Sequence, residues 1–257
     1  MNITRREFLR LAGAFTASAC IASPAFGEEA VAIPVLLYHD ISDSFRDPHT
    51  VSPSFFAAQL EWLYNDGYRV IPMREISNPP AHDKLAVITF DDGYTSFIDY
   101  AFPLLKEYGF CATINVIGEL VGKYIPEGAN SSRPLLSWDE YRHLLKSGVV
   151  DIGCHAHALH VSASKGMLDV SDEALRQDLR MFLETLWKET GTKTDILAWP
   201  YGFYDARSIN IAEQEGFRYL QTTRQAFFNT PGNFSEIPRK NINNRHNLVA
   251  FRIGVTS

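Results

Sequence analysis

The sequence predicts an α/β fold in one domain, with a parallel sheet curled into a barrel, closed or incomplete, of about seven strand–helix units. Strand-like and helix-like stretches alternate along the chain, as in proteins whose parallel strands are joined by outer helices. The apolar runs are continuous, which is typical of strands buried on both faces. No Gly-x-Gly-x-x-Gly or phosphate-binding glycine-rich loop follows these runs, which argues against a nucleotide site.

Each expected strand is a short apolar or β-branched run between turn residues, and each expected helix begins at a capping residue or a proline and ends at a glycine. The expected strands are residues 34–38, 68–71, 85–89, 111–117, 149–153, 195–198 and 217–221, with a weak last strand near Ile237 or after Asn247. The expected helices run from Ser52 to Gly67, Pro103 to Gly109, Ser137 to Gly148, Ser171 to Gly191 and Asp205 to Gly216.

The first residues carry the pattern of an export signal. Paired arginines, Arg5 and Arg6, precede a small and apolar stretch at residues 11–22 that is too short to span a bilayer as a stable helix. A small-x-small cleavage pattern then ends at Gly27. We therefore expect residues 1–27 to be a twin-arginine signal peptide, cleaved after Gly27.

Two alternatives apply at this terminus: a basic amphipathic helix that is retained, and lipid attachment at Cys20, although the residues before Cys20 match a lipidation signal poorly. No other segment reaches the ~20 apolar residues that a membrane span needs. Residues 28–257 are expected to form the one folded domain. The twin-arginine route would deliver it to the periplasm or the extracellular space.

Composition limits the partners and the cysteine chemistry. The formal net charge of the 257 residues is −6, and the mature chain is more acidic still because the signal is basic. An acidic protein is poorly suited to a polyanion, so no nucleic-acid partner is expected. Beyond the signal, Cys111 and Cys154 remain, and we expect both to be buried free thiols.

The most informative stretch, at residues 85–94, is LAVITFDDGY. Asp91 and Asp92 follow an apolar run that is expected to be a buried strand, where an unpaired charge would cost several kcal/mol. Adjacent side chains point different ways, so one carboxylate can bind a cation while the other holds or takes a proton. The alternative is a solvated Asp-Gly turn after the strand.

Polar residues gather where the expected strands end, which is where the active site of a parallel α/β barrel lies. Neutral histidine and carboxylate are ligands of Zn²⁺ and similar ions, and a catalytic site uses three protein ligands. One aspartate with two histidines completes such a site, either as His155 with His160 or as His155 with His157. The strand exits concerned carry His39-Asp40, Asp91-Asp92, the histidines 155, 157 and 160, and Pro200-Tyr201-Gly202.

The segment TFDDGY at residues 89–94 resembles the first motif of the polysaccharide deacetylases, also called carbohydrate esterase family 4 or the NodB homology domain. The resemblance covers residue 34 to the C-terminus. The spacing from His155 to His160, one residue longer than in most members, and WPYG at 199–202 are similar to the branch that deacetylates poly-β-1,6-N-acetylglucosamine of biofilms. Supporting motifs are PVLLYH at 34–39, Ala112-Thr113 and Leu136-Ser137-Trp138.

This resemblance implies a distorted (β/α)7-type barrel and a metal-dependent hydrolase that removes N-acetyl groups from an acetylated amino-sugar polysaccharide. It also implies a divalent transition ion, Zn or else Co, Ni or Fe, that polarises the acetamide carbonyl and the attacking water. The implied roles are Asp91 as general base, Asp92, His155 and His160 as metal ligands, the backbone N–H of Tyr201 as an oxyanion donor, and His39, Trp199 and Pro200 as substrate contacts.

The chain departs from the family pattern at two points. Many members carry an arginine, two residues before the proline of the third motif, that tethers the base, and Ala198 stands at that place. Many also carry a late Leu-x-His whose histidine is the general acid, and no such triplet occurs around the late His246. His157 is another candidate for the acid, and its alternative role is a hydrogen bond to Asp91 or Asp92.

Two other functions stay open on the sequence. A binuclear metallo-amidohydrolase or phosphoesterase would use His155 and His157 as a paired ligand set. A carbohydrate-binding relative would keep the fold and lack turnover, because the arginine and the acid are absent from their usual places. A glycosidase is disfavoured, since adjacent aspartates diverge and do not flank one bond at the required separation.

Overall fold

The computed structural model describes residues 31–44, 47–125, 133–160 and 165–256. The expected signal peptide at residues 1–27 and the alternative lipidation site Cys20 lie outside the described residues. Within the described ranges, no helix is both long enough and apolar enough to cross a membrane.

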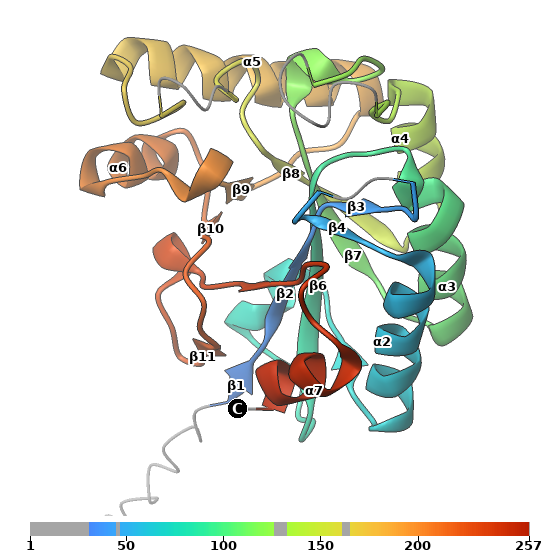
Figure 1. Cartoon of the computed structure of the whole chain (residues 1–257). Helices are drawn as coiled ribbons and strands as arrows, with labels where there is room; N and C mark the ends of the chain where they lie inside the picture. Colours follow the sequence, from blue (N-terminus) through green and yellow to red (C-terminus); the bar gives the residue numbers. More distant parts are fainter. Residues whose placement is uncertain (1–30, 45–46, 126–132, 161–164, 257) are drawn as a thin grey trace, which may run out of the picture.

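A curled sheet of parallel strands forms the centre of the structure, and helices cover its outside (Figure 1). The strand order is β10-β9-β8-β7-β6-β2-β12, and β5 pairs with the beginning of β6. This curled half-barrel confirms the expected α/β fold. Its strands are β2 (Val35–Tyr38), β5 (Arg69–Val70), β6 (Leu85–Asp92), β7 (Ala112–Val116), β8 (Val150–Cys154), β9 (Ile196–Ala198), β10 (Tyr219–Gln221) and β12 (Lys240–Asn241).

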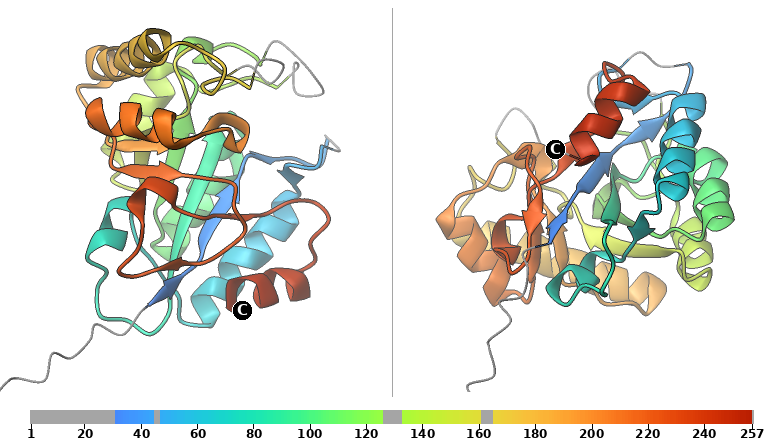
Figure 2. Two further views of the ribbon diagram at one scale, coloured as in Figure 1. Left: turned by 90° about the vertical axis from the view of Figure 1, so that its left-hand side faces the viewer. Right: turned by 90° about the horizontal axis from the view of Figure 1, so that it is seen from below.

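The helices pack on one another around the sheet, α2 against α3, α4 against α5, and α5 against α6 (Figure 2). Their apolar faces join the sheet in one large core. The α-helices of the described chain are α2 (Pro53–Asn65), α3 (Phe102–Tyr108), α4 (Trp138–Lys146), α5 (Asp172–Thr190), α6 (Ala206–Gln214) and α7 (Leu248–Thr256). Short helical turns are η1 (Met73–Ser77), η2 (Phe97–Ala101), η3 (Gly118–Leu120), η4 (Pro200–Gly202) and η5 (Phe234–Glu236).

Four residues expected to begin helices are observed as N-caps. Ser52, Ser137, Ser171 and Asp205 each accept a hydrogen bond from the backbone N–H three residues later. Such a cap stabilises a helix by about 1 kcal/mol, so these local signals fix where the helices begin. Outside the main sheet, β1 (Ala32–Ile33) pairs with β11 (Phe228–Asn229), and β3 (Asp40–Ile41) pairs with β4 (Thr50–Val51).

Some boundaries differ from expectation in ways that affect the site. β6 is buried along its whole length and continues to Asp92 instead of ending at Thr89. The weak last strand lies at β12, just after Ile237, whereas the residues after Asn247 form helix α7. Cys111 and Cys154 are both free thiols, as expected. Cys154 is buried, whereas Cys111, just before β7, is only half-buried.

Candidate metal centre and active site

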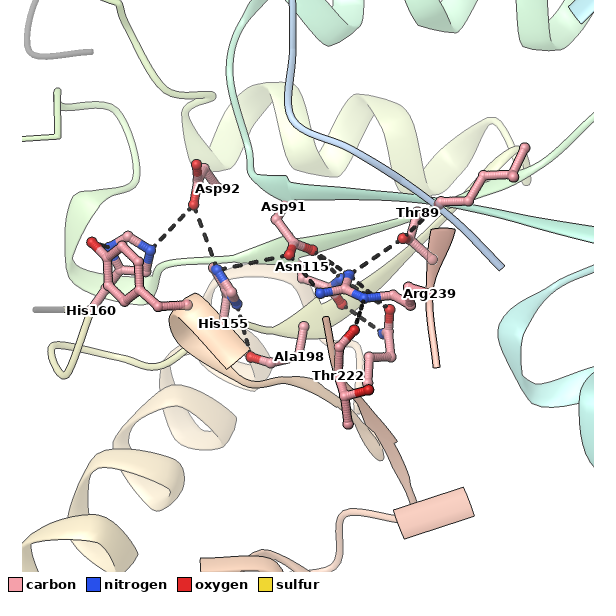
Figure 3. Close-up of polar contacts among 12 residues, drawn as sticks. Thr89, Asp91, Asp92, Asn115, His155, His160, Ala198, Thr222 and Arg239 are labelled. Carbon is pink, nitrogen blue, oxygen red and sulfur yellow. Dashed lines mark hydrogen bonds and ion pairs between the residues drawn. The ribbon is translucent and has the colours of Figure 1, made fainter. Parts of the chain in front are cut away.

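Asp91 and Asp92, the last two residues of β6, point in different directions at the carboxyl end of the sheet (Figure 3). The backbone of Asp92 is left-handed, with φ of 70°. Non-glycine residues adopt this conformation rarely and at a cost of about 1–2 kcal/mol. With this turn in the chain, Asp91 faces Arg239 in the interior, and Asp92 faces His155 and His160.

Arg239 holds Asp91 in a bidentate ion pair. Nη1 and Nη2 of Arg239 lie 2.8 Å from Oδ1 and Oδ2 of Asp91, and Arg239 is fully buried. Asn115 of β7 donates a further hydrogen bond to Oδ1 over 2.7 Å. Burial by itself would raise the pKa of Asp91, but the charge of Arg239, helped by His155, outweighs burial and holds this pKa well below its usual range. Asp91 is therefore an ionised carboxylate with a fixed orientation.

A buried polar network holds Arg239 in turn. Its Nε donates to the carbonyl oxygen of Thr222 over 2.9 Å, and its Nη1 lies 3.2 Å from Oε1 of Gln221. Gln221 also donates to Oδ1 of Asn115 over 3.1 Å. Because Gln221 ends β10 and Arg239 precedes β12, this network links the two end strands of the sheet beneath Asp91.

Asp92, His155 and His160 form the one group of ligand-type side chains, among the described residues, that is spaced to hold a metal ion. Their ligand atoms all lie within 4.8 Å of one another. Oδ1 of Asp92 is 3.6 Å from Nε2 of His155 and 3.4 Å from Nε2 of His160. In a tetrahedral site with bonds of ~2.1 Å, ligand atoms lie about 3.4 Å apart. The donor types and their spacing thus fit a three-residue transition-metal site with a position left open.

The protonation states of these groups suit metal binding. Burial lowers the pKa of His155, against the opposing charges of Asp91 and Asp92, which favours the neutral imidazole that a metal requires. Burial opposes the ionisation of Asp92, but His160 and the other nearby histidines outweigh it and hold the pKa of Asp92 well below its usual range.

The orientation of each histidine is set by the hydrogen bond of its other ring nitrogen. Nδ1–H of His155 donates to the carbonyl oxygen of Ala198 over 2.8 Å, which leaves Nε2 facing Asp92. Nδ1 of His160 lies 3.3 Å from the hydroxyl of Tyr201, and the two rings pack with their centroids 4.7 Å apart. Such contacts fix the tautomer and direction of a metal-binding imidazole.

The structure does not bring His157 into this group. The expectation that His155 and His157 share a face assumed a continued strand, and this assumption was wrong, because β8 ends at Cys154 and Ala156 has a φ of 75°. The His157 ring instead packs beside Gly118, where a Cβ would lie 2.5 Å from its Nδ1. That Nδ1 is buried without a hydrogen-bond partner in the described part of the chain.

His39 comes directly after β2, which pairs with β6 on the side opposite β7. Burial lowers the pKa of His39 to about 4, while the charges of Asp92 and Asp91 act in the opposite direction. Its ring packs on that of His49, with centroids 4.7 Å apart. Within the described ranges, its buried Nδ1 has no hydrogen-bond partner. Nδ1 of His39 is thus available for a hydrogen bond to a bound molecule.

Trp199, Pro200 and Tyr201 follow β9 directly, and they differ in exposure. Trp199 and Pro200 are buried, and their role as substrate contacts stays a prediction. Tyr201 is 44% exposed, and its backbone is left-handed, with φ of 58°. Gly202 also has a positive φ, and a Cβ there would lie 2.1 Å from Oγ1 of Thr223. This tight turn aims Tyr201 at His160.

The functional residue that sequence reasoning missed is Arg239. It takes up the ion pair with Asp91 that the usual arginine, at the position of Ala198, would make. A weak signal is present, because Arg239 closely follows Ile237, near which a weak last strand is expected. A lone arginine in such a segment needs a buried carboxylate partner, but the sequence does not say which one.

The family model described as polysaccharide deacetylase matches residues 78–220, more than half of the chain. The chain belongs to the polysaccharide deacetylase family. The resemblance carried by the TFDDGY segment is thereby confirmed, and the Asp91–Arg239 pair and the Asp92–His155–His160 group lie in the deacetylase fold.

Relatives and solved structures extend this comparison. The deacetylase chain is 27% identical over 203 residues to YxkH of Bacillus subtilis strain 168, a protein assigned to the polysaccharide deacetylases, covering 76% of this chain and 66% of YxkH. It is 23% identical over 249 residues to poly-β-1,6-N-acetyl-D-glucosamine N-deacetylase of Escherichia coli K12, covering 83% of this chain and 37% of that enzyme. The chain thus spans less than two thirds of both relatives. The structure of IcaB from Ammonifex degensii superposes with a TM-score of 0.78 at 26% identity, covering 88% of this chain and 97% of IcaB.

Proposed function

We propose that this polysaccharide deacetylase is a metal-dependent hydrolase that removes N-acetyl groups from an N-acetylglucosamine polymer of the poly-β-1,6 type. The observation that carries the proposal is the separation of two adjacent carboxylates onto different partners, Asp91 onto Arg239 and Asp92 onto two histidines. One carboxylate is thereby available to accept a proton while the other holds a cation. The name of the Escherichia coli relative supports the polymer class.

A divalent transition ion, Zn or else Co, Ni or Fe, would be held by Asp92, His155 and His160. When bound, such an ion supplies Lewis-acid polarisation of an amide carbonyl and of a water molecule. The two imidazoles already direct Nε2 at Asp92, because Ala198 and Tyr201 engage their Nδ1 atoms. Little rearrangement of the chain is therefore needed for binding.

Two residues would act on the attacking water and on the carbonyl. Asp91 takes a proton from the water as the water oxygen adds to the acetamide carbon, and Arg239 keeps the carboxylate in place. The backbone N–H of Tyr201 donates to the carbonyl oxygen as that oxygen becomes negative. The C–N bond then breaks, which releases acetate and leaves the free amine on the sugar once the nitrogen has gained a proton.

We assign the role of proton donor to His39 in preference to His157. The charges of Asp92 and Asp91 act to raise the pKa of His39, whereas the His157 ring packs beside Gly118. A low pKa makes His39 neutral in the free enzyme, but negative charge developing on the acetamide oxygen would raise the pKa of a neighbouring imidazole. His39 would then gain the proton that Asp91 has taken from the water, and donate it to the nitrogen as the C–N bond breaks.

A pocket of about 180 Å³, whose lining includes Tyr94, Tyr100 and Arg133, supports the proposal of a carbohydrate substrate. Tyr94 lines it and comes two positions after Asp92 in the chain, and burial, together with the charge of Asp92, raises the pKa of Tyr94. The pocket also exposes Tyr100, next to Asp99. Aromatic faces with hydrogen-bonding side chains are suited to pyranose rings, which carry both apolar and hydroxyl surfaces.

The other two functions are less well supported by the placement of these residues. A binuclear centre needs His157 beside His155, and His157 is not among the clustered ligands of the described chain. A relative without turnover would lack the arginine that tethers the base, and here Arg239 supplies that ion pair to Asp91 in place of a residue at Ala198.

Export by the twin-arginine route to the periplasm or the extracellular space is part of the proposal. It depends on the sequence of residues 1–27 alone. A polysaccharide of the cell exterior as substrate agrees with that location.

Release of acetate from defined oligomers tests the proposed function. The purified protein would be treated with a chelator, resupplied with Zn²⁺ or Co²⁺, and incubated with β-1,6-linked and β-1,4-linked N-acetylglucosamine oligomers. We expect metal-dependent acetate release that is faster on the β-1,6 oligomer. Binding of either oligomer without acetate release by the metal-loaded protein would instead identify a carbohydrate-binding relative.

A further inference from the structure

The loop between the two histidine ligands is held by a buried carboxylate from another element. Asp178 of α5 accepts three consecutive backbone N–H groups, from His157 and Ala158 over 2.7 Å each and from Leu159 over 3.0 Å. Asp178 is only 6% exposed, so these charge-assisted hydrogen bonds are shielded from water. The contacts join a helix on the outside of the sheet to a loop at the site.

The opposite side of this loop is fixed by η3. The backbone N–H groups of Gly118 and Glu119 donate to the carbonyl oxygens of Ala156 and His157 over 3.0 and 2.9 Å. Gly118 also lies so close that a Cβ there would meet the His157 ring. η3 therefore satisfies two carbonyl oxygens of the loop, and Asp178 satisfies three of its N–H groups, which restricts the movement of the loop.

The two histidines depend on this loop to different degrees. His155 follows β8 directly, and its backbone N–H donates to Val116 of the neighbouring strand over 2.8 Å. His160 comes five positions later, after the left-handed Ala156 has turned the chain away from the strand. Its ring must nevertheless return to within 5.0 Å of the His155 ring. The sheet positions the first histidine, and the loop alone carries the second.

We propose that Asp178 is a positioning residue of the metal centre, because its carboxylate gathers the three N–H groups of the loop and so sets the place of His160. The inference rests on the proposed metal-dependent function. Asp178 acts through the backbone of the loop and is not itself a ligand. Because Asp178 already orders the loop in the free protein, metal binding loses less conformational entropy. Removing the Asp178 carboxylate should therefore weaken the metal affinity.

The test combines Asp178→Asn with Glu184→Gln, an acid-to-amide control at an exposed position of the same helix. Asparagine has nearly the shape of aspartate, but its NH2 group would confront loop N–H donors instead of accepting from them. Titration with Co²⁺ measures the dissociation constant, and the visible absorption of bound Co²⁺ reports the coordination geometry. We expect Asp178→Asn to bind Co²⁺ about 10–100-fold more weakly with an altered spectrum, and Glu184→Gln to match the wild type.

Amide hydrogen exchange of the metal-free protein gives a second readout that needs no metal. In the wild type we expect protection of the amides of His157, Ala158 and Leu159, although they lie outside any helix or strand, and we expect Asp178→Asn to lose it. Unchanged Co²⁺ affinity and spectrum in a folded Asp178→Asn protein would overturn the proposal. Rapid exchange of these amides in the wild type would also overturn the proposal. This readout is available even if the Asp178→Asn protein does not fold. Failure of the wild type to bind Co²⁺ would refute the metal site itself, whatever the exchange shows.

Discussion

Arg239 and Asp91, 148 positions apart in the chain, form a fully buried bidentate ion pair with both N–O distances at 2.8 Å. The arginine therefore reaches Asp91 from the last part of the sheet, and not from the position of Ala198 in the third motif. Because both charges are buried, each depends on the other for compensation. The pair links the stability of the fold to the ionisation of the proposed general base.

Replacing Arg239 with Met is expected to lower the free energy of unfolding at neutral pH by about 3–5 kcal/mol, because it leaves Asp91 buried and unpaired. In the wild type the folded-state pKa of Asp91 is depressed, so the pair stabilises above the ordinary value of 3.8 and loses its effect as the pH falls through the folded-state pKa. In Arg239→Met the strongest opposition to burial is lost and only the nearby histidines still lower this pKa, so the pKa rises and the deficit should shrink as the pH is lowered. Denaturant unfolding across pH measures both, with the exposed Arg69→Met as control.

The ligand and base assignments predict opposite patterns of metal content. Asp92→Ala, His155→Ala and His160→Ala should each lose bound metal and activity, because three protein ligands are the minimum for the site. Asp91→Asn should keep the metal and lose activity by ~10²-fold or more, the usual effect of removing a general base. Metal content of the purified, folded variants checks this. Loss of metal from Asp91→Asn would mean that the two aspartates exchange roles.

Tyr201→Phe separates the hydroxyl of Tyr201 from its ring and backbone. The variant keeps the packing on His160 but loses the hydrogen bond to Nδ1. A hydrogen bond of this kind contributes about 1 kcal/mol, so metal affinity should fall by about fivefold. Tyr204→Phe is the matched control, because the Tyr204 hydroxyl donates to Glu236 away from the histidines. Equal affinities of the two variants would count against a role for the hydroxyl.

His39→Ala and His157→Ala distinguish the two candidate proton donors. His39→Ala should keep the metal and lower turnover by ~10²-fold on an amide, with a smaller effect on an activated acetate ester, whose leaving group needs no proton. His157→Ala should affect both substrates alike, because its ring packs at Gly118. Parallel assays on an N-acetylglucosamine oligomer and on the ester give the comparison. The opposite pattern would return the role to His157.

The proposed twin-arginine signal predicts that export depends on the guanidinium groups of Arg5 and Arg6. Replacing Arg5 and Arg6 together with Lys should trap the precursor in the cytoplasm, since the twin-arginine route recognises the arginine pair and not charge alone. Cell fractionation and N-terminal sequencing of the exported protein provide the measurement, with the mature N-terminus expected after Gly27. Normal export of the double variant would indicate an ordinary secretory signal.

The sequence by itself determined the order of the elements and the place of the carboxylate pair. These features depend on local signals: a continuous apolar run requires burial, and a serine or aspartate cap satisfies the free N–H groups at a helix start. Asp91 and Asp92 were therefore identifiable as two acids at the end of a buried strand, which must find partners. The motif around them was also sufficient to indicate the family.

The partners of those acids were decided only by the tertiary structure. Arg239 meets Asp91 because the curl of the sheet brings the segment before β12 beside β6, and no local pattern encodes a contact across 148 positions. The placement of His157 likewise depends on one left-handed residue, Ala156, which interrupts the alternation that a strand would have imposed. Local propensity fixes what each segment becomes, whereas the pairing of buried charges depends on how the sheet closes in three dimensions.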